Sequence, residues 1–563
     1  MKIIKKLIGV ICIAGVGCLL YFGGMAEDVS DKAAEVISSF YGVKKADAVN
    51  SVPVEVYIND SRLDLLPSSK LFMTDDLIWM ADSGTISRIF ECSVERMDSQ
   101  TVRMEKDGES FLISQDGILT EGSDSIQVSE PTVMLKNDTV YISAETAARL
   151  FHMDFTWDES LNRIDIEGGS ALAALPDSYD LRDYGRVPEA RSQGNLGTCW
   201  AFASLSALES TLLPKTSETF AVDHLSLLNG FNISQNDGGD YNIALAYLTS
   251  WSGPVREQDD PYGDNQTDAS LTPVRHLQEA VNIAEKDYDT IKRMIMTCGA
   301  VQSSFYSDIE VANMDSEYYS AAEASYYYGG TALANHDIII IGWDDHYDKN
   351  RFKYVPEHDG AFLCQNSWGQ NFGDGGCFYI SYEDTNIGRN NMVYTKVEDA
   401  DNYDKIYQTD RLGWIGAIGY NEPEAYFANK YSADGIEALK AVSFYATAPE
   451  TSYEIYVVRE KASSQNLDSG IFLKSGFIEE TGYYTVPFDG NITVSGDFAV
   501  IVKIFTEDAV HPVAIEYNGE HHEFDADLSD GEGYISYDGR YWQRAEENYA
   551  CNLCLKAFTD QIE

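Results

Sequence analysis

The strongest helical pattern in the chain begins at Cys199 and ends before Pro214. Apolar side chains recur within it at spacings of three and four residues, which places them on one face of a helix. These side chains are Phe202, Leu205, Leu208 and Leu212. Because proline cannot continue a helix, the pattern predicts a buried helix over residues 199–213 with Cys199 in its first turn.

The residues after this helix divide into a helical part and a strand-rich part. A second helical face lies within residues 244–251, and a looser one runs from Val281 to Ile295. The second face consists of Ala244, Tyr247, Leu248 and Trp251. Later apolar runs, such as residues 378–382, are typical of strands. We therefore expect a mostly helical half over 199–300 and a mostly β half over 300–395.

Residues 53–167 are β-rich and contain an internal repeat. The stretch 74–80 reappears as 137–143, and 88–90 reappears as 149–151. Each copy reads as strand, turn, short helix and hairpin, which predicts an α+β repeat domain. The small residues at 168–174 are typical of a linker to the next domain.

Residues 401–563 alternate strand-like runs with turn signals. The apolar and aromatic runs at 441–445, 453–458 and 498–504 favour strands, and Asp-Gly pairs at 489–490 and 538–539 favour turns. This pattern predicts a β-sandwich. The fold class that we expect for the whole chain is multidomain α+β.

The charge of the chain limits its partners. Forty basic residues against 91 acidic ones give a net charge of −51. Nucleic-acid binding is excluded, because phosphate contacts need clustered lysine and arginine. An acidic surface of this size fits an extracellular protein and steers cationic partners toward it. Nine cysteines in 563 residues are too few for a disulfide scaffold.

The first 26 residues predict export or anchoring. Three lysines precede an uncharged run from Leu7 to Gly24. A run of this length fits either a cleaved signal peptide or a single membrane anchor, and both alternatives stay open. Both place the following residues outside the cytoplasm, because the basic flank stays inside. Residues 27–52 read as a polar linker.

Cys199 is a candidate nucleophile. The dipole and free N–H groups of a helix N-terminus favour an anion and predict a lowered thiol pKa. Gly194 and Gly197 keep the approach to the thiol free of Cβ atoms. Gln193 offers an amide N–H that can stabilise an oxyanion, together with the N–H of Cys199.

A nucleophile of this kind needs a base and a group that orients it. His336 opens the apolar, strand-like run 336–343. Asn366 follows 30 residues later, within Asn366-Ser367-Trp368-Gly369, and can fix the tautomer of the imidazole. Trp368 can cover that hydrogen bond. These residues predict a Cys-His-Asn site for nucleophilic catalysis that needs no cofactor and no metal.

With these motifs in this order, residues 175–400 resemble papain-family (C1-type) cysteine peptidases, whose His and Asn lie at similar spacing after the Cys. The resemblance implies a two-lobed peptidase with a helical lobe and a β-barrel lobe. It implies catalytic roles for Gln193, Cys199, His336 and Asn366. It implies substrate-binding roles for Gly197, Trp200, Gly238, Gly239 and Trp368. Asp260-Pro261-Tyr262 resembles a structural turn of the family.

Two positions depart from the family pattern. Leu196 replaces the cysteine of the usual Cys-Gly-Ser-Cys, so that disulfide is absent. Asp337 replaces the usual apolar neighbour of the histidine. Since side chains alternate along a strand, we expect Asp337 to point away from the His336 side; if it does approach, it raises the His336 pKa.

The flanking regions resemble known modules of bacterial surface proteins. Residues 53–168 resemble the copper amine oxidase-like N-terminal repeat domain, a name that does not imply copper. They are interpreted as a packing or wall-associated module, or alternatively as a pro-region that covers the cleft. Residues 401–563 resemble the lectin-like domain that follows some C1 peptidases, which implies cell-surface glycans as ligands. The boundaries that we expect are 1–26, 27–52, 53–168, 175–398 and 401–563.

Other reactive side chains are interpreted as structural. Cys551 and Cys554 have metal-ligand spacing without a second pair. Cys364 and Cys377 flank a predicted hairpin, as free thiols or as a disulfide. His521 and His522 lie in an acidic loop.

The sequence thus predicts an extracytoplasmic cysteine peptidase that acts on proteins or peptides. Two alternatives stay open: a surface adhesion or binding protein whose peptidase unit is silent or slow, and acyl transfer to an amine by the same thioester chemistry.

Overall fold

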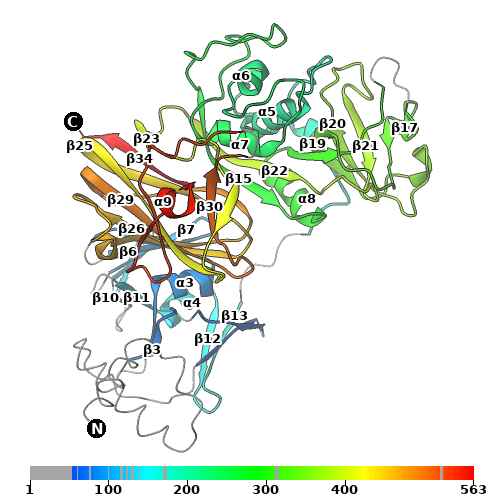
Figure 1. Ribbon diagram of the computed structural model, residues 1–563. Helices are drawn as coiled ribbons and strands as arrows, with labels where there is room; N and C mark the ends of the chain where they lie inside the picture. Colours follow the sequence, from blue (N-terminus) through cyan, green and yellow to red (C-terminus); the bar gives the residue numbers. More distant parts are fainter. Residues whose placement is uncertain are drawn as a thin grey trace, which may run out of the picture.

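The computed structural model contains three units (Figure 1). We call residues 54–168 the N-terminal unit, residues 175–398 the central unit and residues 401–562 the C-terminal unit. It describes residues 54–562 except for 60, 67, 75–77, 99–100, 115–117, 122–123, 128–131, 137–138, 169–173, 311–315 and 520–523. The predicted signal or anchor segment and polar linker, the pair His521-His522 and most of the 168–174 linker lie outside the described residues. Among the described residues, no helix is long and apolar enough to span a membrane.

The helical half of the central unit is built around α5 (Cys199–Leu212), as predicted. Further helices are α6 (Val222–Leu227), α7 (Tyr241–Thr249) and α8 (Tyr288–Thr297), with short 3-10 turns η1 (Leu181–Tyr184) and η2 (Lys349–Arg351). The prediction of helix was wrong for the residues before α8, which form strand β15 (Arg275–Ile283). This strand is hydrogen-bonded on both sides and buried on both faces, so it lacks the alternation that marks a strand.

The β half is organised around β19 (His336–Asp344), whose antiparallel neighbours are β14, β16 and β20. Strand β15 pairs with β22, and β20 pairs with β21. One apolar core joins α5 to these strands, which fixes the start of α5 against the start of β19. The remaining bounds are β14 (Ser178–Asp180), β16 (Val301–Phe305), β17 (Tyr319–Ser320), β18 (Ser325–Tyr326), β20 (Ala361–Gln365), β21 (Cys377–Ser381) and β22 (Asn391–Asp399).

The C-terminal unit consists of sheets that share one core, in line with the predicted sandwich. Strand β25 (Glu424–Ala446) runs through the larger sheet, and β24 (Gly416–Ile418), β30 (Val513–Tyr517) and β33 (Cys551–Leu553) form a smaller one. The other elements are β23 (Lys405–Tyr407), β26 (Thr451–Val458), β27 (Ile471–Ile478), β28 (Gly482–Pro487), β29 (Thr493–Thr506), β31 (Gly533–Ser536), β32 (Gln543–Arg544), β34 (Leu555–Gln561), η3 (Leu467–Ser469) and α9 (Ala545–Tyr549).

The central and C-terminal units are joined through both backbone and core. Strand β28 pairs with β15 of the central unit and with β25 of its own unit. Four buried side chains of the C-terminal unit belong to the core of the central one: Tyr445, Tyr483, Ala514 and Cys554. A shared sheet and a shared core make this a rigid connection rather than a flexible tether.

The N-terminal unit repeats one arrangement twice. In each copy two antiparallel strands lead into a short helix, and a hairpin follows. Asp82 and Ser143 cap the two helices by accepting from the N–H groups of Thr85 and Thr146. The first copy contains β3 (Leu71–Met73), β4 (Trp79–Asp82), α3 (Ser83–Phe90), β5 (Ser93–Arg96) and β6 (Thr101–Lys106). The second contains β10 (Val133–Lys136), β11 (Thr139–Ser143), α4 (Ala144–Leu150), β12 (Asp154–Asp158) and β13 (Arg163–Glu167). The remaining strands are β1 (Glu55–Ile58), β2 (Ser61–Leu63), β7 (Glu109–Ser114), β8 (Ile118–Glu121) and β9 (Asp124–Gln127).

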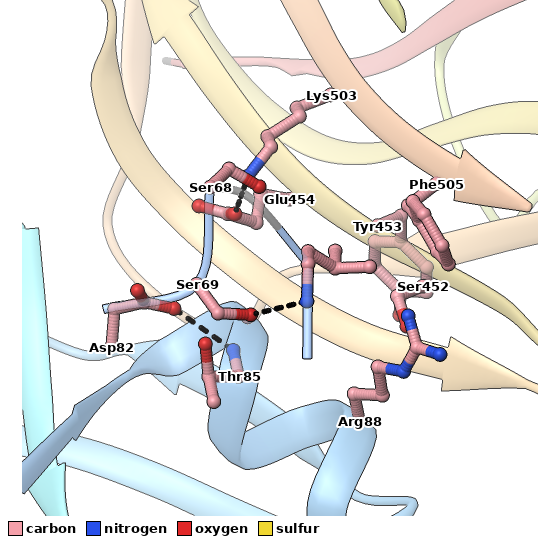
Figure 2. Close-up of a pocket in the computed structure, with 12 residues that line it drawn as sticks. Ser68, Ser69, Asp82, Thr85, Arg88, Ser452, Tyr453, Glu454, Lys503 and Phe505 are labelled. Atoms are coloured by element: carbon pink, nitrogen blue, oxygen red, sulfur yellow. Dashed lines mark hydrogen bonds and ion pairs between the residues drawn. The ribbon is translucent and has the colours of Figure 1, made fainter. Parts of the chain in front are cut away.

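The described part of the N-terminal unit packs on the C-terminal unit, on the side away from α5 (Figure 1). Strand β5 adds to the edge of β27, and buried Lys474 pairs with buried Glu95 at 3.5 Å. Figure 2 shows a second contact beside α3: Lys503 pairs with Glu454 at 2.9 Å within the C-terminal sheet and donates to the Ser68 hydroxyl of the N-terminal unit at 3.2 Å. These contacts hold the described repeats against the C-terminal sheet and not over Cys199.

Candidate active site

Cys199 is the first residue of α5, and its thiol is partly buried. No side chain caps this helix, so its first N–H groups stay free of side-chain acceptors. The N–H groups of Cys199, Trp200 and Asp337 lower the thiol pKa, as the sequence predicts for a helix start, but burial outweighs them and raises the pKa to about 11. The prediction of a net lowered pKa was therefore wrong.

His336 opens β19 and is 7% exposed. Its Nε2 lies 2.8 Å from Oδ1 of Asn366, and the backbone N–H of Ser367 donates to the same oxygen at 2.8 Å. Because that N–H can only donate, the atom facing His336 is the amide oxygen, and Nε2 carries the hydrogen. The nitrogen Nδ1 is therefore the one that can accept the proton of the thiol.

Considered separately, the Cys199 thiol and the His336 imidazole each favour the neutral form, because burial disfavours the charged one. Burial lowers the pKa of His336 to about 4, although the Asn366 hydrogen bond acts in the opposite direction. If a proton passes from Cys199 to His336, both charges form at once, and opposite charges attract each other more strongly in a buried site than in water. The Trp368 ring packs on the imidazole ring of His336, 4.7 Å away from centre to centre, and shields that side of His336 from water.

The side-chain amide of Gln193 is held by two hydrogen bonds. The Ser367 hydroxyl donates to Oε1 at 2.6 Å, and Nε2 donates to the carbonyl of Leu196 at 2.8 Å. One amide hydrogen is left for a ligand. The backbone N–H of Gln193 also donates to the Ser367 carbonyl, which ties this segment to the one that carries Asn366.

Two further supports of this segment are missed by the sequence interpretation. Tyr262, predicted only as part of a turn, donates to the Gln193 carbonyl at 2.9 Å and lies 2.7 Å from the Thr198 hydroxyl. Arg191 pairs with Glu209 at 2.9 Å, and both are inside the protein. A carboxylate in the apolar helix α5 is the signal that could have revealed the second support.

The glycines predicted to bind substrate have different surroundings. A Cβ at Gly197 would lie 3.1 Å from the Asn236 carbonyl, and one at Gly239 would lie 2.5 Å from the Trp200 ring. A Cβ at Gly238 would meet no atom within 4 Å. Trp200 is 2% exposed, so the prediction that it contacts substrate was wrong. Its ring packs beneath Gly239 and supports the predicted substrate strip, Gly238 and Gly239.

Asp337 does not act on His336. Its carboxylate accepts from the Ser304 hydroxyl at 2.7 Å and from Nε2 of Gln302 at 3.1 Å. Burial raises its pKa to about 6, and its charge raises the pKa of Cys199. The carboxylate therefore opposes formation of the thiolate once it ionises.

Replacing Asp337 with asparagine should speed alkylation of Cys199 by neutral iodoacetamide at pH 7–8 by about three- to tenfold, because the repelling charge is removed. Below pH 5 the rates should converge, since protonated aspartic acid and asparagine are then both neutral. In the described part of the chain, the titratable groups that interact with Asp337 include Cys199, Asp240, Tyr241 and Tyr394. Rates measured from pH 4.5 to 8.5 test this; a difference that is independent of pH would contradict it.

Replacing Asn366 with alanine should lower the peptidase kcat/KM, because the His336 ring loses the acceptor that fixes its tautomer. Loss of one buried hydrogen bond costs about 1–3 kcal/mol, or about five- to 150-fold in rate. Peptide hydrolysis and the thermal unfolding midpoint should be measured together. A fall in stability with unchanged kcat/KM would make the role of Asn366 structural.

Four other cysteines, which the sequence analysis interprets as structural, are buried. Cys364 and Cys377 are buried free thiols on β20 and β21, offset by one position in the strand register. Cys551 and Cys554 are buried in the C-terminal unit. The residues that the structure describes contain no group of three or more His, Cys, Asp or Glu placed to hold a metal ion.

Comparison with known proteins agrees with this geometry. Residues 175–397 match the family model "Papain family cysteine protease", and residues 406–559 match "Lectin like domain". Cathepsin S of Mus musculus is 27% identical over 247 residues, which are 41% of this chain and 64% of the relative. Fruit bromelain of Ananas comosus is 28% identical, over 36% of this chain and 54% of the relative. The chain thus spans less than two thirds of the length of these curated relatives.

Two solved structures resemble the central and C-terminal units together. One is the clostridial cysteine protease Cwp84 after propeptide cleavage, at 27% identity, a TM-score of 0.60, and coverage of 68% of this chain and 99% of that one. The other contains the cysteine protease and lectin-like domains of Cwp84, described as a surface layer associated protein of Clostridium difficile, at 26% identity, a TM-score of 0.60, and coverage of 70% and 91%. This chain therefore carries a papain-family (C1) cysteine peptidase domain, which is a hydrolase, followed by a lectin-like domain.

Proposed function

We propose that this protein is an extracytoplasmic cysteine peptidase that hydrolyses proteins or peptides through Cys199. The observation that carries the proposal is the pair of hydrogen bonds at the start of α5 and β19. One bond fixes His336 against Asn366, and the other fixes Gln193 against Ser367. A base, its orienting group and an oxyanion donor are thereby preorganised around one thiol.

In the acylation step, Nδ1 of His336 takes the thiol proton and the Cys199 sulfur attacks the peptide carbonyl carbon. The oxyanion that forms is bound by the Gln193 amide and the Cys199 N–H. The imidazolium then gives its proton to the departing amine as the C–N bond breaks, which leaves a thioester on Cys199.

In the deacylation step, His336 takes a proton from water, and the hydroxide attacks the thioester carbonyl. The same donors bind the second oxyanion. The C–S bond then breaks, the carboxylic acid leaves, and the proton returns to the Cys199–His336 pair. Asn366 holds the imidazole in one orientation through both steps.

The location and the flanking units belong to the same proposal. The surface-layer association stated for Cwp84 and the basic, apolar N-terminal segment support a place at the cell surface. The match of residues 406–559 to a lectin-like domain supports cell-surface glycans as ligands. The copper amine oxidase-like resemblance of residues 53–168 stays a prediction, as does the choice between a signal peptide and an anchor.

Incubation of the full chain with an epoxysuccinyl thiol probe tests the proposal. We expect one label, mapped to the peptide that contains Cys199, and loss of labelling in His336→Ala. If the full chain stays unlabelled, the same reaction on residues 175–563 separates a covered site from an inactive one. Failure of both chains to react would overturn the proposal.

The lectin-like match also favours a second function, surface binding with a slow peptidase unit. Cys199→Ala separates the two functions, because adhesion to cells would survive this substitution and proteolysis would not. The intact pairs of His336 with Asn366 and Gln193 with Ser367 favour the peptidase.

A further inference from the structure

One ionisable group beside the nucleophile has no part in the reaction described above. The carboxylate of Asp337 directly follows the catalytic base in the chain, and it acts on the Cys199 thiol both through its charge and through its backbone N–H. The side chains that bind it among the described residues are both neutral donors, Ser304 and Gln302. Within the described parts of the chain, no lysine or arginine forms an ion pair with Asp337.

The carboxylate is held in place by a chain of hydrogen bonds. Ser304 lies directly opposite Asp337 in the register of β16 and β19. The Oε1 atom of Gln302 accepts from the hydroxyl groups of Ser204 at 2.9 Å and Tyr394 at 3.3 Å. Because an ionised carboxylate can only accept, the amide nitrogen of Gln302 is directed at Asp337, and Oε1 faces the two hydroxyl groups. Residues from α5, β16 and β22 thus fix one negative group beside the nucleophile.

A second negative group acts on it from the other lobe. Asp240 caps the start of α7 and is exposed, and its charge raises the pKa of Asp337. Tyr241, beside it, interacts with both carboxylates. Asp240 follows Gly238 and Gly239, the strip predicted to bind the substrate backbone. The predicted substrate strip therefore ends at one of two carboxylates that interact across the lobes.

A partly buried carboxylate without a cation is costly, because neutral donors compensate only part of its lost hydration. A substrate cation would supply the missing charge. We propose that Asp337 is a specificity-determining residue that binds the side chain of a lysine or arginine of the substrate, close to the scissile bond. This inference rests on the proposed peptidase function and names the substrate class for that same site.

The inference links substrate recognition to the nucleophile. A bound ammonium or guanidinium group neutralises the charge that otherwise raises the thiol pKa of Cys199, so a cationic substrate favours the reactive thiolate. The net charge of −51 acts in the same direction at long range, since it attracts basic peptides. Selection at Asp337 should therefore appear in kcat as well as in KM.

Matched fluorogenic peptides test the inference on the full chain. Each peptide carries lysine or norleucine at one of the four positions nearest the scissile bond, with alanine elsewhere, so that each pair differs by one ammonium group. At one position the wild-type protein should prefer lysine by at least about tenfold in kcat/KM, the value expected for a charge-assisted hydrogen bond. Asp337→Asn should lower this ratio at least about tenfold.

The control is Asp268→Asn, which removes the same charge from an exposed turn of the same domain, where the carboxylate accepts from Ser270. It should leave the lysine-to-norleucine ratio within about twofold of wild type, because long-range steering is then the only change. Asp240→Asn should give an intermediate ratio.

The outcomes distinguish this inference from the function on which it rests. Cleavage of the norleucine peptides without a lysine preference at any position would overturn the inference and leave the peptidase function intact. A lysine preference that survives in Asp337→Asn would also overturn it. No cleavage of any peptide, together with no labelling of Cys199 by the epoxysuccinyl probe, would overturn the peptidase function and the inference together.

Discussion

Replacing Cys199 with alanine should lower kcat/KM for peptide hydrolysis by at least about 10⁴-fold, because no other group in the site can form the thioester. The His336–Asn366 and Gln193–Ser367 hydrogen bonds do not involve the sulfur, so the fold should be retained. Initial rates on a fluorogenic peptide, with thermal unfolding of the same samples, measure both effects.

His336→Ala is the matched variant for this substitution, since it leaves the thiol and removes its base. It should cost a similar factor, and the double variant should be little worse than either single variant, because residues that act as one unit are not additive. Residual hydrolysis by Cys199→Ala within about tenfold of wild type would show that the thiol is not the nucleophile.

Replacing Gln193 with alanine should lower kcat by about 10²–10³-fold, equivalent to about 2.7–4 kcal/mol, because one of the two oxyanion donors is lost. KM should change little, since the donor acts mainly on charge that develops in the transition state. Alkylation of Cys199 by iodoacetamide forms no oxyanion and should stay within about threefold of wild type.

Comparable losses in peptide hydrolysis and in alkylation would mean that Gln193→Ala disturbs the thiol itself, which would contradict the oxyanion role. Ser367→Ala is the graded control. It removes the hydroxyl that fixes the Gln193 amide but leaves the donor in place, so it should cost about tenfold or less.

The elements that carry the proposed catalytic residues could be predicted from sequence, because each coincides with a strong local pattern. Cys199 begins a helix with an apolar face, and His336 begins an apolar strand. Each pattern fixes where the backbone of its residue lies. The family resemblance supplied the rest, since hydrogen bonds between residues 30 and 174 positions apart are not contained in any local pattern.

The electrostatics of the site were not accessible, because they depend on burial. The helix start of α5 lowers the thiol pKa as expected, but the opposing contribution of burial is larger. The role of Asp337 depends on Ser304 and Gln302 of a neighbouring strand, and on the absence of an ion pair with any lysine or arginine among the described residues. Alternation along one strand cannot reveal these contacts.

The architecture shows the same division. The strand–helix–hairpin repeat is local, so the echo in the sequence predicted it. Strand β15 was predicted as helix, because pairing on both sides removes its alternation. Docking of the N-terminal repeats on the C-terminal sheet involves contacts between distant segments, such as the buried pair of Lys474 with Glu95, which no spacing within one segment indicates.

The most direct test of the central claim is the intact mass of the protein quenched in acid during turnover of a p-nitrophenyl ester of an N-acylated lysine. Esters acylate thiol peptidases faster than peptides do, so the acyl-enzyme should accumulate. We predict a mass increase equal to one acyl group, located on the peptide that contains Cys199 and absent in Cys199→Ala. Turnover of the ester with no covalent adduct on Cys199 would contradict the account.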